Sequence, residues 1–244
     1  MNALKAVFRR ELNSYFLTPV AYVFIVIFLI TANAFAFYLG GLYERGQADL
    51  APFFAYHPWL YLFLVPALSM RLWAEERKSG SIELLLTLPI RPWHAVVGKF
   101  FAAWAFTALA VVLTFPIWMT VNYLGAPDNG TILAAYIGSV LMAGGFLAVG
   151  SCVSALTKNQ VVAFIVSVVL CFGLLAAGHP MILDLFSAWA PQALVDGIAS
   201  LSFLTHFESI SKGVIDLRDL VYFFLLIGAS LYATSLILGI RQAD

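Results

Sequence analysis

The most chemically varied stretch of the sequence is residues 75–89, Glu-Glu-Arg-Lys-Ser-Gly-Ser-Ile-Glu-Leu-Leu-Leu-Thr-Leu-Pro. Its charged first half leads into a predicted short helix, with Gly80 as the N-cap and Glu83 near the favourable end of the helix dipole. Apolar side chains cover two faces of that helix: Ile82, Leu85 and Leu86 on one, Leu84 and Leu88 on the other. Two apolar faces are costly to expose to water, so the segment is expected either to dock in a partner's groove or to lie half-immersed in lipid.

The other side chains capable of chemistry do not form a catalytic set. Metal ligation by His57, His179 and His206 is one interpretation, and scattered boundary histidines, with His94, are the other. Five acidic residues form either a cation-attracting rim or a solvated face: Asp184, Asp196, Glu208, Asp216 and Asp219. Four small residues within the spans indicate close helix packing: Ser151, Cys152, Ser154 and Cys171. No Gly-x-x-x-x-Gly-Lys-Ser/Thr phosphate loop is present. We therefore expect no catalytic residue, no metal site and no cofactor in this chain.

The composition indicates a membrane protein. Of the 244 residues 62% are hydrophobic and 11% are charged, and the mean hydropathy is +0.94. A soluble domain is about half apolar and about a quarter charged. The apolar residues cluster in runs of roughly 18 to 25, long enough to cross about 30 Å of hydrocarbon as helices, and the runs lack the period-two alternation of barrel strands. The predicted fold class is an all-α integral membrane protein.

Six membrane spans are predicted within a single domain that covers residues 1–244. They lie at about 20–42, 59–73, 95–123, 132–156, 161–178 and 220–240. The second is short, and the third is long enough to tilt or to project beyond the bilayer. No span carries a charged residue near its middle, which argues against an ion path through the chain.

The basic residues divide unequally between the two sides that six spans define. Ten lie on the side of both termini and three on the other: Lys5, Arg9, Arg10, Arg71, Arg77, Lys78, Arg91, Lys99, Lys158 and Arg241, against Arg45, Lys212 and Arg218. The positive-inside rule therefore predicts that both termini are cytoplasmic.

Two further stretches are predicted to form amphipathic helices. Residues 1–17 place one apolar face opposite Lys5, Arg9 and Arg10, and this face consists of Leu4, Val7, Phe8, Leu12, Tyr15 and Phe16. This helix is a surface anchor, an elbow helix that braces a cytoplasmic partner, or both. The external segment 179–217 holds apolar pieces too short to cross, at 181–189 and 194–204, which indicate interfacial or re-entrant helices.

Residues 75–89 resemble the cytoplasmic loop of ABC-2-type permeases, in which acidic and basic residues precede Gly-Thr/Ser-x-Glu-x-Leu-Leu and a proline. Ser81 stands where Thr is common and retains the hydroxyl. The likeness covers nearly the whole chain and is closest to the gliding-motility-associated (GldF-like) permease subunit, through residues 10–12, 16–19, 66–70, 98–100, 124–130, 156–160 and 212–219. It implies a fold like that of type V exporters, with an elbow helix, six spans, a coupling helix and external re-entrant helices.

The resemblance also implies which residues meet an ATPase. In the family the coupling helix, at about 76–88 here, sits in a cleft of the ATPase subunit. The corresponding docking positions are Glu76, Arg77, Gly80, Ser81, Glu83, Leu84, Leu85, Leu88 and Pro89, and the elbow-helix positions are Arg9, Arg10, Glu11 and Phe16.

The expected function is that of the permease subunit of an ABC transporter in a bacterial inner membrane, exporting an unidentified substrate. A separate ATPase, in two copies, would carry ATP and Mg. The second permease half is either a copy of this chain or a different permease subunit; the bilayer is a further partner and no nucleic acid is expected. Two alternatives are a membrane scaffold on which the ATPase does mechanical work without cargo, and an intramembrane enzyme.

Overall fold

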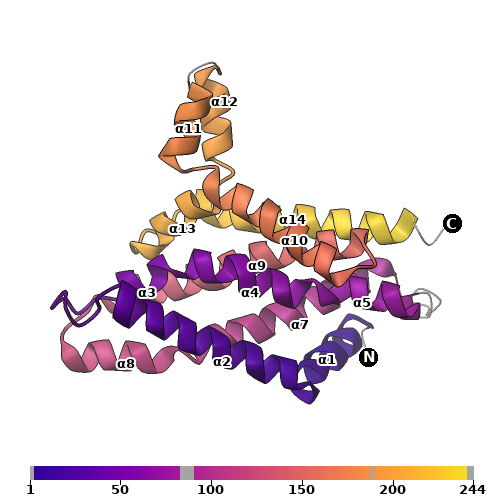
Figure 1. The fold of residues 1–244 in the computed structure, drawn as a ribbon, viewed down its shortest axis with the longest axis horizontal. Coiled ribbons are helices and arrows are strands. Elements are labelled where there is room, and N and C mark those ends of the chain that lie inside the picture. Colours follow the sequence, from indigo (N-terminus) through magenta and orange to yellow (C-terminus); the bar gives the residue numbers. More distant parts are fainter. Residues whose placement is uncertain (1–2, 83–90, 188–189, 241–244) are drawn as a thin grey trace.

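The computed structural model describes residues 3–82, 91–187 and 190–240, and every regular element within these ranges is helical (Figure 1). In chain order the helices are α1 (Ala3–Leu17), α2 (Pro19–Ala34), α3 (Ala51–Ala55), α4 (His57–Ser69), α5 (Arg71–Ser79), α7 (Pro92–Val112), α8 (Phe115–Leu124), α9 (Asn129–Leu156), α10 (Gln160–Ala176), α11 (Pro180–Ser187), α12 (Gln192–Ala199), α13 (Phe203–Ser211) and α14 (Leu217–Ile240). A π-helical turn at Phe35–Leu39 extends α2. The predicted all-α class is confirmed.

Helix α9 is the centre of the bundle. Its 28 residues pack against α4, α5, α7, α10, α13 and α14. The helix begins where the Asp128 carboxylate accepts hydrogen bonds from the backbone N–H groups of Gly130 and Thr131. The Thr131 hydroxyl also donates to this carboxylate, and these bonds together lower the pKa of Asp128. A helix of this length extends about 42 Å, which exceeds the hydrocarbon thickness of a bilayer.

Four of the helical stretches are long and apolar enough to cross a membrane: Ala21–Leu39, Pro92–Leu124, Asn129–Leu156 and Leu217–Ile240. These coincide with four of the six predicted spans. The other two correspond to shorter helices, α4 with 13 residues and α10 with 17. Both pack alongside α9. The count of six spans therefore stays a prediction, because a crossing helix needs about 20 residues when it is not tilted or extended.

The long third span contains a break. The structure divides 92–124 into α7 and α8 at Leu113 and Thr114, just before Pro116. Proline has no N–H to bond the carbonyl of Val112, so the helical ladder is interrupted there. The Thr114 hydroxyl donates to the Val111 carbonyl at 2.6 Å and lies 2.9 Å from the Tyr136 hydroxyl of α9, which fixes the position of the break.

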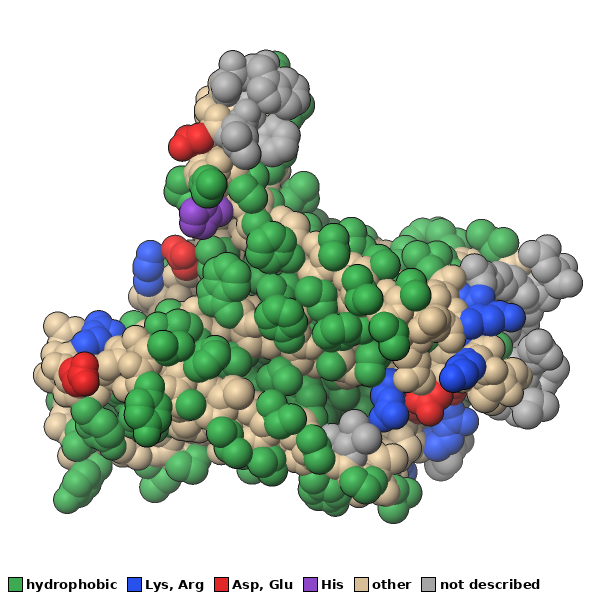
Figure 2. All heavy atoms as spheres, viewed as in Figure 1, with side chains coloured by type: hydrophobic (Ala, Val, Ile, Leu, Met, Phe, Trp, Pro, Cys, Tyr) green, Lys and Arg blue, Asp and Glu red, His purple; other side chains and the backbone are tan. Residues whose placement is uncertain are grey.

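The flanks of the bundle are apolar. Large hydrophobic side chains stand exposed along α2, α10 and α14, and the space-filling view shows them covering the length of the molecule (Figure 2). Representative members are Val26 and Ile30 of α2, Ile165 and Val169 of α10, and Phe224 and Leu225 of α14. A continuous apolar surface of this kind is unfavourable in water and is expected of a bundle surrounded by lipid.

The predicted interfacial segment 179–217 consists of two parts with different packing. Helices α11 and α12 form a hairpin that projects away from the bundle (Figure 1), and their main contacts are with each other. Helix α13 instead packs on α9, α10 and α14, and Phe203, Phe207 and Ile210 are buried there. Within the described part of this segment, the hairpin stands apart from the bundle, whereas α13 belongs to it.

The described basic residues lie mostly at one end of the bundle. This basic end contains α1, α5, the start of α7 and the turn from α9 to α10, and Figure 1 shows both chain termini there. Lysine and arginine side chains gather on the same end in Figure 2. Arg45 lies between α2 and α3, Lys212 directly follows α13 and Arg218 lies at the start of α14, which are in the opposite half of the bundle (Figure 1). The structure thus preserves the charge asymmetry that the sequence predicts.

Candidate functional site

Ser154, near the end of α9, holds the start of α5 in place through hydrogen bonds to backbone groups of α5 and the residue before it. The hydroxyl of Ser154 accepts hydrogen bonds from the backbone N–H groups of Trp73 and Ala74, each at 3.1 Å, and donates to the Met70 carbonyl at 2.8 Å. The first four N–H groups of a helix have no partner within it. Because α4 ends at Ser69, two of these donors in α5 depend on α9 for their hydrogen bonds.

Two longer side chains of α5 reach the same part of α9. The indole N–H of Trp73 donates to the Ser151 hydroxyl at 3.1 Å, and the guanidinium of Arg77 donates to the Ala155 carbonyl at 2.6 Å. Ala155 lies in the last turn of α9, where carbonyls lack intrahelical partners and a cation also interacts favourably with the helix dipole. The predicted close packing near Ser151 and Ser154 is confirmed, and it joins α9 to α5.

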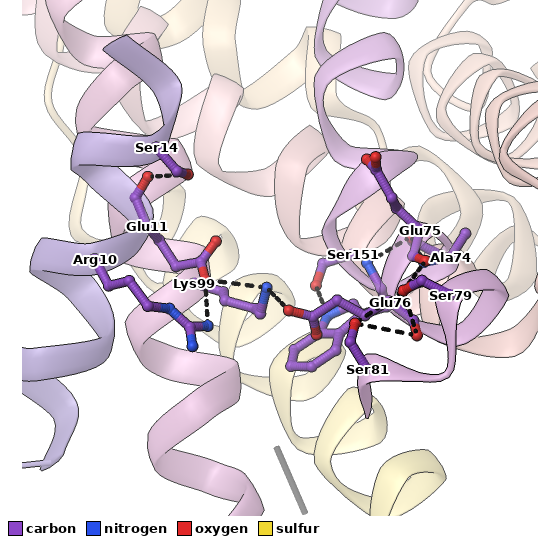
Figure 3. A network of polar contacts seen from close by, with 12 residues as sticks. Arg10, Glu11, Ser14, Ala74, Glu75, Glu76, Ser79, Ser81, Lys99 and Ser151 are labelled. Atoms are coloured by element: carbon purple, nitrogen blue, oxygen red, sulfur yellow. Dashed lines mark hydrogen bonds and ion pairs between the residues drawn. The ribbon is translucent and has the colours of Figure 1, made fainter. Parts of the chain in front are cut away.

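A buried lysine connects three helices at this end (Figure 3). The ammonium of Lys99, in α7, lies 2.8 Å from a carboxylate oxygen of Glu76 in α5 and 3.3 Å from one of Glu11 in α1. The Lys99 side chain is only 4% exposed, and its ammonium lies 5.2 Å from the centre of the Trp73 ring. A buried cation is tolerated only when carboxylates compensate it, so α1, α5 and α7 are expected to keep their mutual positions.

Helix α1 approaches the start of α7 closely enough to require a glycine. A Cβ at Gly98 would lie 2.8 Å from Val7 Cγ1 and 3.3 Å from the Leu4 carbonyl oxygen. Farther along, the ring of Tyr15 stacks on that of Phe106 at 5.0 Å and the ring of Phe16 meets it edge-on at 6.0 Å. The apolar face of α1 therefore packs largely on the protein's own helix rather than lying wholly in lipid.

The elbow-helix positions predicted from the resemblance have different environments. Glu11 is mostly buried and pairs with both Lys99 and Arg10, the latter at 2.6 Å. Arg9 and Arg10 are exposed, and Phe16 is partly exposed beside α7. Of these four positions, Glu11 and Arg10 belong to a network of ion pairs, and Glu11 is the mostly buried one of the two. We term it the Lys99 network: Arg10, Glu11, Glu76 and Lys99.

The structure corrects the predicted extent of the coupling helix. Residues 76–79 are the last turn of α5, which ends at Gly80 with φ of +73°, in the left-handed region. Gly80 is thus the C-cap of α5, a role that the sequence did not predict, because a helix commonly ends on a glycine that adopts this conformation at little cost. It also directly precedes the helical residues Ser81 and Ile82, the place that the sequence predicts for it. The helix predicted over 76–88 is therefore interrupted at Gly80.

Serine hydroxyls bridge the interruption. Ser79 bonds back to the carbonyls of Glu75 and Glu76, and its hydroxyl lies 2.9 Å from that of Ser81 (Figure 3). Helical conformation resumes at Ser81 and Ile82. The remaining predicted docking residues lie outside the described residues: Glu83, Leu84, Leu85, Leu88 and Pro89.

The histidines considered as metal ligands lie in separate surroundings. His57 Nδ1 is 2.7 Å from the Ser139 hydroxyl of α9, whereas His206 Nδ1 is 2.6 Å from Asp219 and its Nε2 is 2.9 Å from the Ser200 carbonyl. His179 accepts a hydrogen bond from the Met181 N–H. Among the described residues, no group of three or more His, Cys, Asp or Glu side chains is placed to hold a metal ion.

The acidic rim also divides. Asp219 is buried beside His206, while Asp184, Asp196, Glu208 and Asp216 are exposed. The ring nitrogens of His206 face the Asp219 carboxylate and the Ser200 carbonyl oxygen. Both hydrogen bonds form when each ring nitrogen carries a hydrogen, or when a protonated Asp219 donates to the ring. This contact joins α13 to α14, and it leaves the exposed carboxylates as solvated groups.

Sequence reasoning missed the central roles of Lys99 and Trp73. The sequence places Lys99 among the basic residues that set the orientation and in the stretch 98–100 that carries the resemblance, and Trp73 at the end of a predicted span, with no partner for either. The available signal for Lys99 was its position about one turn inside an apolar run, because a charge there requires a compensating partner. Nothing in the spacing identified Glu11 and Glu76 as these partners, since they come from segments 65 residues apart in sequence.

Comparison with known proteins identifies the family. Residues 60–240, about three quarters of the chain, match the family model described as ABC-2 family transporter protein. The match begins within α4, so it leaves out α1, α2 and α3. No curated protein matches the chain closely enough to be reported as a relative. Together with the apolar helices, the family match makes this a multi-pass membrane protein of the permease type, and the chain belongs to the ABC-2 family of transporter proteins.

Proposed function

We propose that this chain is the permease subunit of an ATP-driven exporter, and that α5 with the segment after Gly80 receives force from a separate ATPase subunit. The chief supporting observation is the Lys99 network. Through it, Glu76 near the end of α5 is tied to α1 and α7, while Ser154 ties the start of α5 to α9. A push on α5 would therefore reach three other helices without passing through a flexible loop.

The residues beyond Gly80 suit the docking itself. The sequence predicts two apolar faces for 82–88, of which one can rest on the membrane domain and the other can enter a groove of a partner. The partly buried side chain of Ile82 packs against the hydrophobic core, which is consistent with this division. Gly80 separates the docking segment from α5, so the two can meet at an angle.

The Gly80 break also supports a mechanical interpretation. ATP-driven closure of the ATPase pair would shift the docking segment, and α5, α1 and α7 would follow as a packed unit. Rigid-body rocking of packed elements is a common mode of switching between two arrangements. The side of the chain with the basic end is assigned to the cytoplasm of a bacterial inner membrane by the positive-inside rule.

The family supports partnership with an ATPase, and we propose the rest of the complex from the sequence resemblance. The complex would contain two ATPase subunits, which hold ATP and Mg, and a second permease half. The resemblance to the gliding-motility-associated branch, carried by the sequence stretches alone, favours a different permease subunit over a second copy of this chain. The apolar walls are compatible with an amphiphilic cargo, and no described residue identifies it.

The docking proposal is tested by co-purification with the candidate ATPase and by measuring ATPase activity. Gly80→Val places a β-branched residue at positive φ, and Glu83→Arg reverses a charge in the docking segment. Each should weaken ATPase binding by about tenfold or more, since the docking contacts are central to the interface. Gly46→Val is the matched control, because Gly46 also has positive φ, at +61°, and lies in the loop between α2 and α3.

Unchanged ATPase binding and activity in both variants would show that the docking segment is assigned wrongly. A second measurement separates transport from a scaffold role. Sealed vesicles containing the complete complex should accumulate labelled amphiphilic candidates only when ATP is hydrolysed. If ATPase activity is stimulated by the permease but no candidate moves, the scaffold alternative is favoured.

A further inference from the structure

A cavity lies between the elbow formed by α1 and α2 and the junction of α4 with α5. Its volume is about 570 Å³, within the range of roughly 300 to 1,000 Å³ that ligand pockets occupy. It opens on the flank of the bundle near the basic end, where α2 exposes Val23 and Ile27. The cavity is therefore accessible from the side on which lipid is expected.

The lining of this cavity changes character along the bundle. Toward the basic end it is polar, with Glu11, Arg71, Glu75, Glu76 and Lys99. Toward the middle of the bundle it is apolar, with Ala21, Phe24, Leu64, Ala67 and Leu68. The lining is thus charged near the end of the bundle and apolar deeper in. A lipid molecule in one leaflet has the same arrangement, with its head group outermost and its chain directed inward.

The charges at the polar end favour a zwitterionic head group. Three carboxylates line the cavity together with Arg71 and Lys99, and Arg10 pairs with Glu11 from outside it. The local charges thus balance, with both signs within reach of one head group. A purely anionic head would meet the three carboxylates, and a purely cationic one would meet Arg71 and Lys99.

An unpaired carboxylate oxygen of Glu76 indicates which zwitterionic head group fits best. Glu76 uses Oε1 for Lys99, while its Oε2 is buried without a hydrogen-bond partner. A buried carboxylate oxygen without a donor is unfavourable, and a primary ammonium can supply an N–H that a quaternary one lacks. Arg71 pairs only loosely with Glu75, at 3.7 Å, and is 42% exposed, so its guanidinium can also meet a phosphate.

We propose that this cavity is a binding site for one zwitterionic phospholipid that carries a primary ammonium, taken from the leaflet on the basic side. The ammonium pairs with Glu76 and Glu75, the phosphate with Arg71, and an acyl chain lies against Phe24, Leu64 and Leu68. The site goes beyond the proposed function, since it requires neither ATPase nor cargo. The bound lipid would fill the gap between the elbow and α5 and hold the Lys99 network dry.

Native mass spectrometry of the purified full-length chain, with any subunits that remain bound, tests the site directly. The protein is exchanged into nanodiscs of phosphatidylethanolamine, phosphatidylcholine or phosphatidylglycerol with matched acyl chains. We expect one retained phosphatidylethanolamine per chain, held about tenfold more tightly than the other two, because only it donates N–H to a carboxylate. Equal retention of the three lipids would overturn the proposal, as would retention of none, which would leave water as the occupant.

A cavity-filling variant provides the second test. Ala67→Trp blocks the apolar half of the cavity without changing a charge, and it should abolish the retained lipid. Ala229→Trp is the control, because Ala229 is exposed on α14 and does not line the cavity. The alternative occupant of the cavity is a second copy of the chain. If the wild-type chain is a dimer that Ala67→Trp dissociates while lipid retention is unchanged, a second copy covers the cavity and the proposal is wrong. The lipid readout does not depend on ATPase binding, so its failure would leave the proposed function untouched.

Discussion

The two ends of the bundle both contain buried polar groups, but they use them differently. At the basic end, Lys99 joins α1, α5 and α7, and Ser154 adds α9, so four helices share one connected set of contacts. At the opposite end, polar contacts connect elements in pairs, as His57 does with Ser139 and His206 with Asp219. The α11–α12 hairpin there packs mainly on itself.

The difference concerns the transmission of movement. A network shared by four helices resists displacement of any one of them, because each shift would leave a buried charge or donor without its partner. Paired contacts hold two elements together but leave the remainder free to adjust. The basic end is thus built as one unit, and the opposite end as separately attached parts, which suits a molecule driven from one side.

The largest expected effect is the loss of the central cation. Lys99→Met leaves Glu76 without its counter-charge and leaves Glu11 with only the exposed Arg10, and breaking a buried pair in this way costs about 3–5 kcal/mol. Thermal unfolding in detergent should show a clear loss of stability. The exposed Lys158→Met is the control. Adding Glu11→Gln and Glu76→Gln should restore part of the loss, and an unchanged unfolding temperature in the single variant would refute the proposed rigid unit.

The corresponding change at the opposite end should be smaller and local. His206→Leu removes the hydrogen bonds to Asp219 and to the Ser200 carbonyl, and a bond to a charged group contributes about 1.5–3 kcal/mol. Hydrogen exchange should increase in α13 and at the start of α14, with α5 unaffected. His179→Leu, at an exposed histidine, serves as the control. Equal increases in α5 and α13 would show that the two ends are not independently held.

Removing the hydroxyl of Ser154, which bonds to the start of α5, should destabilise the basic end less than removing Lys99. Ser154→Ala leaves the N–H groups of Trp73 and Ala74 without an acceptor, which costs about 1–2 kcal/mol by analogy with helix N-caps. Hydrogen exchange at these two amides should rise. Ser187→Ala, on exposed α11, is the comparison. Protection that persists at Trp73 and Ala74 would mean that α5 does not depend on α9 for its start.

The smallest effect is expected in the projecting hairpin. Gln192 donates to Asp196 across one turn of α12 at 3.1 Å, and both side chains are exposed. Asp196→Ala should change the free energy of unfolding by no more than about 0.5 kcal/mol, as surface substitutions usually do. Unfolding in detergent, with wild-type protein in parallel, measures it. A loss comparable to that of Ser154→Ala would show that the hairpin is packed on something essential.

The apolar runs in the sequence determine much of the fold by themselves. A helix longer than about 20 apolar residues has few alternatives in lipid, so four spans and the all-α class follow from hydropathy alone. The charge asymmetry followed similarly, because lysines and arginines stay at the ends of such helices. Hydropathy does not decide whether α4 and α10 cross the membrane, because with 13 and 17 residues they are shorter than the roughly 20 residues that a crossing helix needs.

The candidate site depended more on tertiary structure. The sequence indicated the segment at 75–89 and, through resemblance, Glu76 and Glu11 as positions of interest, but it could not show that both bind Lys99. It placed Gly80 at the start of a helix but missed that the same glycine ends α5, because only its positive φ shows that one helix stops there before the next begins. Local pattern determines which segments are helical; contacts between residues distant in sequence arise only from packing, and these contacts placed the buried charges.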